Sequence, residues 1–227
     1  MKNQTYVDNA STTKIDAAVK KEMDKYFTQI FGNPNSNHLQ GRLAKNAVEQ
    51  SRAKVAKILN CKPSEIIFTS GGTESINLAI QGIARAIKNK GKHIITTKIE
   101  HPAVLETCKY LKQNEGFEIT YLDVDNCGFV DIQQLQKSIQ QDTILITAMY
   151  ANNEIGTIQQ IQKIAEIARE KKVYFHTDAC QAAGMLELNV KELNIDLMTL
   201  NASKINGPKG SGILYVKSGV QIMPLIF

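Results

Sequence analysis

The stretch Ile66-Ile67-Phe68-Thr69-Ser70-Gly71-Gly72-Thr73-Glu74 predicts a short apolar strand that turns directly into a helix. Residues 66–69 form the apolar run that indicates the strand. Gly71 and Gly72 follow at the turn, and helical patterning then continues to about residue 88. This unit places small residues and free backbone N–H groups at the start of a helix.

Strand-like and helix-like segments alternate on both sides of this unit. The other expected strands are 93–97, 117–122, 143–149, 173–177, 196–200 and 211–216. The other expected helices are 42–59, 102–113, 131–139 and 158–170. Repeated β–α units predict an α/β fold, with a mostly parallel sheet sandwiched by helices and right-handed crossovers.

The composition of the chain narrows the class of protein. It has 227 residues, of which 43% are hydrophobic and 22% charged, and this balance excludes a disordered chain. The net charge of +5 is spread along the sequence, so we expect no nucleic-acid partner. We also expect no membrane partner, because no apolar run is long enough to span a bilayer. The first residues lack a secretory or transit pattern, which favours a cytoplasmic protein.

The cysteines and histidines give no sign of a metal site. Cysteines lie at positions 61, 108, 127 and 180, with no CxxC pair and no metal-ligand spacing to the four histidines. A disulfide framework is not expected in a chain of this length. We therefore predict no bound metal.

Polar residues follow the predicted strands at the points where the strands end. In a mostly parallel sheet these ends meet at one edge, which is where ligands bind in such folds. From five separate segments we expect the following residues at this edge: Gly72, Thr73, His101, Asn153, Asp178, Gln181, Asn201, Ser203 and Lys204.

These residue types suit one cofactor when they are taken together. Gly72 and Thr73 at a helix N-terminus suit a phosphate. Asp178 could hold a protonated ring nitrogen, and the flat His101 could stack on the ring. Lys204 can form a Schiff base once it loses its proton. Each residue alone has an ordinary structural explanation, but the set predicts pyridoxal 5'-phosphate (PLP), since neither GxGxxG nor GxxxxGK[ST] is present.

Motifs along nearly the whole chain are similar to those of one enzyme family. They occupy residues 6–13, 32–38, 68–80, 100–105, 152–156, 176–181 and 204–210. With these motifs the chain resembles the NifS/IscS-type cysteine desulfurases, in the class V group of fold-type I PLP-dependent enzymes. The resemblance implies the PLP-dependent transferase-like large domain over residues 15–227, preceded by an N-terminal segment of residues 1–14.

The resemblance also implies a role for each candidate residue. Lys204 and His101 would be catalytic, and both would contact PLP. Gly72 and Thr73 would contact the phosphate, with Asn201 as a further donor. Asn153 would approach the ring and the substrate, Asp178 would pair with the pyridine nitrogen, and Gln181 would bond the ring hydroxyl. Ser203, beside the lysine that carries the Schiff base, would also bind the cofactor.

The activity implied is conversion of L-cysteine to L-alanine, with the sulfur passed on as a persulfide. The resemblance implies a homodimer, and a sulfur-acceptor or iron–sulfur scaffold protein as a further partner. Two alternatives remain open at this point. One is another class V PLP enzyme, such as a selenocysteine lyase or an aminotransferase. The other is a non-catalytic remnant of the family.

Two departures from the family pattern bear on activity. Family members continue beyond this length with a small C-terminal domain, which carries the loop with the nucleophilic cysteine. We therefore expect a large domain that is incomplete at its C-terminus, and none of the four cysteines matches that loop. The family tetrapeptide Ser-x-His-Lys is here Asn201-Ala202-Ser203-Lys204.

Overall fold

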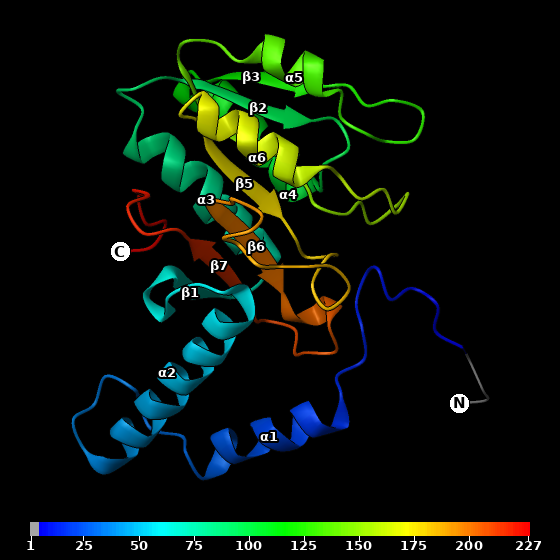
Figure 1. The fold of residues 1–227 in the computed structure, drawn as a ribbon. Coiled ribbons are helices and arrows are strands. Elements are labelled where there is room, and N and C mark those ends of the chain that lie inside the picture. Colours follow the sequence, from blue (N-terminus) through cyan, green and yellow to red (C-terminus); the bar gives the residue numbers. More distant parts are fainter. Residues whose placement is uncertain (1–4) are drawn as a thin grey trace.

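A single twisted sheet forms the centre of the molecule. The computed structural model describes residues 5–227, and within them a seven-stranded sheet has the order β1-β7-β6-β5-β4-β2-β3 (Figure 1). The strands are β1 (Ile66–Thr69), β2 (His93–Thr97), β3 (Glu118–Leu122), β4 (Thr143–Thr147), β5 (Tyr174–Asp178), β6 (Leu197–Asn201) and β7 (Gly212–Val216). Strands β2 to β6 pair in parallel, and β7 runs antiparallel to both β1 and β6. The mostly parallel α/β fold is confirmed.

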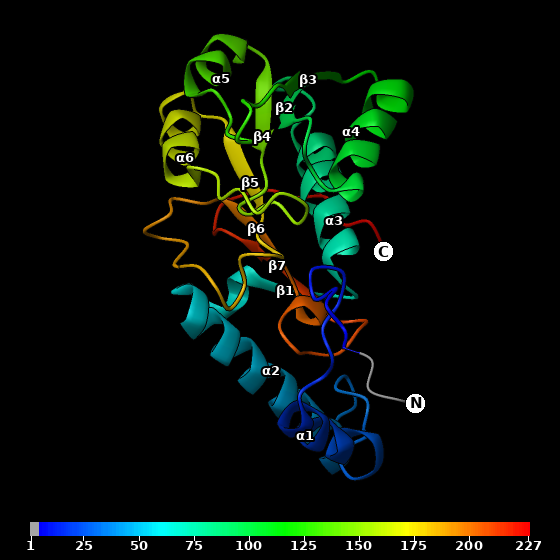
Figure 2. The same cartoon turned by 90° about the vertical axis from the view of Figure 1, so that its right-hand side faces the viewer.

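Helices cover both faces of the sheet, as Figure 2 shows. On one face lie α3 (Gly72–Ala86) and α4 (Pro102–Glu115), and on the other lie α5 (Ile132–Ser138) and α6 (Ile161–Glu170). Neighbouring side chains of β2 point to opposite faces of the sheet. Ile94 packs into the cluster that includes the apolar side of α3 and α4, and Ile95 packs into the cluster with α6. Because both faces are covered, all five residues of this strand are buried, the polar ones together with Ile94 and Ile95.

Two helices lie beside one end of this layered core. They are α1 (Ala17–Thr28) and α2 (Leu39–Leu59). Helix α1 was not expected from the sequence, because it has no buried residue and hence no apolar stripe that would reveal its period. Its start is nevertheless capped, since the Asp16 side chain accepts a hydrogen bond from the Ala18 N–H. Helix α2 begins three residues before the expected position, where His38 provides the N-cap.

Several expected boundaries are wrong by one to three residues, and two of these shifts affect the pocket. Asp178 is the last residue of β5 rather than the first residue after it, because it pairs with Thr199 of β6. Asn201 likewise belongs to β6, where it pairs with Gly212. Both side chains are therefore held by the hydrogen-bonded sheet and not by a loop.

The helices of the described chain are too short or too polar for a bilayer. Among residues 5–227, none has a stretch that is long and apolar enough to cross a membrane.

Candidate functional site

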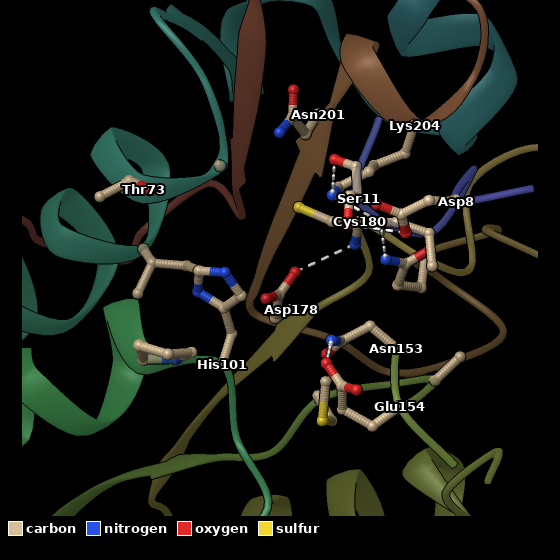
Figure 3. A pocket seen from close by; sticks show the side chains of 17 residues that line it. Asp8, Ser11, Thr73, His101, Asn153, Glu154, Asp178, Cys180, Asn201 and Lys204 are labelled. Atoms are coloured by element: carbon tan, nitrogen blue, oxygen red, sulfur yellow. Dashed lines mark hydrogen bonds between the residues drawn. The ribbon is translucent and has the colours of Figure 1, made fainter. Parts of the chain in front are cut away.

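A pocket of about 510 Å³ lies at the carboxyl ends of the parallel strands. Its lining includes all of the predicted site residues except Ser203, and it adds Asp8, Ala10 and Ser11 from the N-terminal segment. In Figure 3, Thr73 and His101 lie on one side of the pocket, Lys204, Ser11 and Asp8 lie on the other, and Asp178 lies between them. The structure thus brings together residues that five separate segments contribute.

The start of α3 forms one wall of the pocket. The Gly72 backbone begins the helix, so its first N–H groups have no partner within the helix. A side chain at position 72 would crowd this wall, since a Cβ there would lie 3.0 Å from Cys180 Sγ and 3.6 Å from Asn201 Nδ2. The corner therefore offers free N–H groups and the positive end of the helix dipole to an anion.

Asp178 forms the floor of the pocket. Only 6% of this residue is exposed, and its Oδ1 accepts a hydrogen bond from the Cys180 N–H at 3.0 Å (Figure 3). Two residues earlier in β5, His176 contacts the hydroxyls of Thr147 at 2.8 Å and Thr199 at 3.0 Å. Burial lowers the pKa of His176 to about 3, so this imidazole is neutral. A neutral, hydrogen-bonded layer thus supports the carboxylate from below.

His101 caps α4 and faces the pocket from its side. Its Nδ1 accepts a hydrogen bond from the Ala103 N–H at 3.0 Å, which in the neutral imidazole places the proton on Nε2. Pro102 follows at the first helical position, where its fixed φ suits the helix. The ring is exposed, so a flat ligand can reach it.

Glu100, the residue before His101, is a buried carboxyl that the prediction of site residues missed. Its Oε1 accepts hydrogen bonds from the Thr97 hydroxyl at 2.7 Å and from the Met149 N–H at 2.9 Å. Its Oε2 has no partner among residues 5–227. Burial, with a smaller contribution from the charge of Asp178, raises the pKa of Glu100 to about 8. Glu100 is therefore mostly protonated at neutral pH and ties the loop before His101 to the end of β4.

The raised pKa of Glu100 predicts how stability depends on pH. Folding takes up a proton at Glu100 between its unfolded pKa near 4.5 and its folded pKa of about 8, so this group lowers the free energy of unfolding as pH rises through that window. The limiting slope is about 1.4 kcal/mol per pH unit. Glu100→Gln keeps the Oε1 acceptor without the charge. We expect denaturant titrations to show an advantage for the glutamine variant that grows from pH 5 to pH 8, and parallel curves would contradict this.

A second contact joins the loop before His101 to the segment after β4, and it positions Asn153. The neighbouring Asn152 donates from Nδ2 to the Ile99 carbonyl at 2.9 Å. Its Oδ1 accepts from the N–H groups of Glu154 at 2.8 Å and Ile155 at 3.1 Å. Asn152 thereby fixes the turn from which Asn153 points into the pocket (Figure 3).

The N-terminal segment closes the pocket beside Lys204. Lys204 Nζ donates to the carbonyls of Ala10 and Ser11, each at 2.7 Å, and Gln181 Nε2 donates to the Ala10 carbonyl at 2.8 Å. Thr13 anchors the segment, because its N–H and hydroxyl both donate to the Ser203 carbonyl. Sequence reasoning missed Ala10 and Ser11 as contacts of the lysine, since backbone carbonyls carry no residue-type signal.

Ser203 lies outside the pocket lining. It is 8% exposed, and both its N–H and its hydroxyl donate to Asn201 Oδ1. The expectation that Ser203 binds a cofactor directly has no contact in the pocket to support it. Asn201, in contrast, lines the pocket near Gly72.

The cysteines do not supply an activated nucleophile at this site. Cys180 lines the pocket, but burial raises its pKa well above the usual value, so the thiol stays protonated. Burial also raises the pKa of Cys108 to about 12. Cys127 is exposed, and Cys61 is half-buried with its pKa raised by burial to about 11. No group of three or more potential metal ligands gathers within residues 5–227.

The chemistry of these groups fits PLP. A phosphate would meet the N–H groups at the start of α3 and Asn201 Nδ2, a donor that has no acceptor among residues 5–227. A ring would lie between His101 and the floor, with its protonated nitrogen toward the Asp178 carboxylate. Lys204 provides the amine and Gln181 a polar partner for a ring substituent. The pocket volume lies within the usual range of cofactor sites, about 300–1,000 Å³.

Comparisons with known proteins point to one family. The family profile described as aminotransferase class-V matches residues 5–227. A protein named cysteine desulfurase IscS from Dictyoglomus turgidum is 53% identical over 226 residues, and the alignment covers 100% of this chain and 57% of that protein. A putative cysteine desulfurase IscS 1 from Bacillus subtilis is 50% identical over 222 residues, covering 98% of this chain and 58% of that protein. The chain thus spans a little more than half the length of these relatives.

Solved structures show the same fold. A structure titled as a NifS-like protein superposes with a TM-score of 0.96 at 43% identity, covering 99% of this chain and 62% of that one. A structure titled SspA in complex with cysteine gives a TM-score of 0.94 at 40% identity, covering 98% of this chain and 65% of that one. With the profile match over nearly its whole length, this chain belongs to the aminotransferase class-V family, and proteins of the IscS and NifS type are among its relatives.

Proposed function

We propose that the chain is the PLP-binding part of a cysteine desulfurase, which converts L-cysteine to L-alanine and passes the sulfur to a thiol as a persulfide. The observation that carries the proposal is the convergence of Gly72, Asp178 and Lys204 on one pocket. The relatives named as cysteine desulfurases support it, as does the structure whose title records a complex with cysteine. No feature of the pocket favours an aminotransferase or a selenocysteine lyase over a desulfurase.

Each residue has a task in this reaction. Bound PLP supplies an electron-withdrawing ring next to the substrate Cα. The Asp178 carboxylate keeps the ring nitrogen protonated, because the charge-assisted hydrogen bond favours the cation. His101 covers one face of the ring and Gln181 orients it. Lys204 Nζ, when the substrate amine takes its place, lies where it can move a proton at the substrate Cα.

The sulfur transfer balances with a single thiol as acceptor. L-Cysteine and a thiol RSH give L-alanine and the persulfide RSSH: the C–S bond of cysteine breaks, and an S–S bond forms on the acceptor sulfur. The acceptor must react as a thiolate. Cys180 is protonated in its buried position, and Cys61, Cys108 and Cys127 do not line the pocket. We therefore propose that the acceptor thiol comes from outside residues 5–227.

Two measurements on the PLP-loaded chain test the proposal. Lys204 should catalyse exchange of the Cα hydrogen of L-cysteine for deuterium in heavy water, since this step needs no acceptor thiol. With excess dithiothreitol, L-alanine and sulfide should then appear in equal amounts. Formation of pyruvate in place of alanine, or transfer of the amino group to an added keto acid, would contradict the proposal.

We further propose a homodimer. Helix α1 has no buried residue, and Phe27 and Phe31 are exposed by 69% and 67%. Leu39 at the start of α2 is 62% exposed, which adds to an apolar surface of the kind that interfaces cover. Sedimentation velocity should show a dimer that Phe27→Asp with Phe31→Asp converts to a monomer. A monomeric wild-type chain would contradict it.

We propose that residues 15–227 act as the PLP-binding large domain and residues 1–14 as a separate N-terminal segment, of which residues 1–4 lie outside the described part. The contacts of Ala10, Ser11 and Thr13 support this assignment. We propose a cytoplasmic protein, because the cysteines of the described chain are all free. We also propose that its sulfur acceptor serves iron–sulfur cluster assembly or thiolation.

A further inference from the structure

Asn201 and Ser203 form one hydrogen-bonded unit beside the start of α3. The Ser203 N–H donates to Asn201 Oδ1 at 3.2 Å, and the Ser203 hydroxyl donates to the same oxygen at 3.1 Å. A backbone N–H can only donate, so the amide atom on this side must be the oxygen of Asn201 and not its nitrogen. The two bonds therefore determine which way the Asn201 amide faces.

The amide nitrogen faces the other way, toward the phosphate corner. Asn201 Nδ2 lies 3.6 Å from the position that a Cβ on Gly72 would occupy. Within residues 5–227, no protein group accepts a hydrogen bond from Nδ2, although Asn201 is only partly exposed. An unpaired donor beside a helix N-terminus is placed to bind an anion.

We propose that Ser203 is a positioning residue for phosphate: its hydroxyl holds the Asn201 amide so that Nδ2 donates to the phosphate of PLP at the Gly72 corner. The inference rests on the proposed function, since it takes PLP as the ligand of this pocket. Ser203 acts through Asn201, because Ser203 itself does not line the pocket. The two positions at which the tetrapeptide 201–204 departs from the resembled family are thus the two ends of one hydrogen bond.

The test compares binding of PLP with binding of pyridoxal, which lacks the phosphate. Both ligands are titrated into the full 227-residue chain, and binding is followed by visible absorbance. Ser203→Ala removes one of the two bonds to Oδ1, and we expect it to raise the Kd for PLP about threefold to tenfold and to leave the Kd for pyridoxal unchanged. Ser203→Thr retains the hydroxyl and should restore the wild-type preference for PLP.

Two further variants separate positioning from direct contact. Asn201→Asp keeps the oxygen that Ser203 contacts but replaces Nδ2 by a carboxylate oxygen. The Kd for PLP should therefore rise about tenfold or more, again with little change in the Kd for pyridoxal. In the Asn201→Ala background, Ser203→Ala should have no further effect on PLP binding. Ser51→Ala serves as the matched control, because it removes a serine hydroxyl bond to the Ala47 carbonyl on exposed α2.

The outcomes distinguish this inference from the proposed function. Additive effects of the two alanine substitutions, or an equal loss of PLP and pyridoxal in Ser203→Ala, would overturn the positioning role while PLP binding itself stands. A wild-type chain that binds PLP no better than pyridoxal would overturn both. If circular dichroism shows that Ser203→Ala does not fold, two other variants decide the question. The inference requires a PLP-specific loss of binding in Asn201→Asp and no such loss in Ser203→Thr.

Discussion

Replacing Lys204 by alanine is expected to abolish the visible absorbance that the wild-type chain gains with PLP. In the structure, Lys204 Nζ is the lysine amine that lines the pocket, where the carbonyls of Ala10 and Ser11 hold it. Without this amine, no covalent link to the cofactor aldehyde can form in the pocket. Hydrogen bonds and charge should still hold PLP, so equilibrium dialysis should detect residual non-covalent binding at the Gly72 corner.

A nearby lysine provides the matched control for this experiment. Lys209 lies five residues further along and donates to the Thr13 carbonyl at 3.0 Å, but it does not line the pocket. Lys209→Ala should therefore keep the colour. Loss of colour in Lys209→Ala with retention in Lys204→Ala would contradict the assignment of the amine.

Replacing Asp178 by asparagine is expected to weaken PLP binding about tenfold to hundredfold, which is the value of a charge-assisted hydrogen bond in a buried site. The change is isosteric, and an asparagine oxygen can still accept from the Cys180 N–H, so the turn after β5 is preserved. The loss arises because a neutral amide no longer stabilises the protonated ring nitrogen. Exchange of the substrate Cα hydrogen should slow as well, since the ring then withdraws electrons less strongly.

The control for Asp178 has the same local geometry without the pocket. Asp125 Oδ1 accepts from the Cys127 N–H at 2.9 Å, the same contact over two residues that Asp178 makes with Cys180, but Asp125 is exposed and does not line the pocket. Asp125→Asn should leave the Kd for PLP unchanged. Equal effects of the two substitutions, or no effect of Asp178→Asn, would remove Asp178 from the cofactor site.

Much of the sheet could be predicted, because its short strands alternate along the sequence with segments of helical pattern. The predicted bounds 66–69 and 93–97 are those of β1 and β2, although β1 lies at the edge of the sheet and is partly exposed. The end of β5 was placed one residue early: Asp178 is polar, yet it still pairs with Thr199 in the ladder. Helix α1 could not be predicted, because it buries no side chain.

Part of the candidate site could be predicted from residue types, and the rest is visible only in the folded structure. His101 and Lys204 could be proposed from their types and from their positions after strands. The carbonyls of Ala10 and Ser11 could not, since any residue offers a carbonyl. The role of Ser203 depends on a hydrogen bond to a side chain two residues away, and neither the spacing nor the residue type determines that such a bond forms.

Lys204, Asp178 and the Gly72 corner are proposed to contact one molecule of PLP. Reduction of the PLP-treated chain with borohydride converts the link between amine and aldehyde into a stable secondary amine, which peptide mass spectrometry then locates. This assignment predicts a single phosphopyridoxyl modification, on Lys204, and inorganic phosphate should prevent it at a lower concentration in Asp178→Asn than in the wild type. Modification spread over surface lysines, or confined to a lysine other than Lys204, would contradict it.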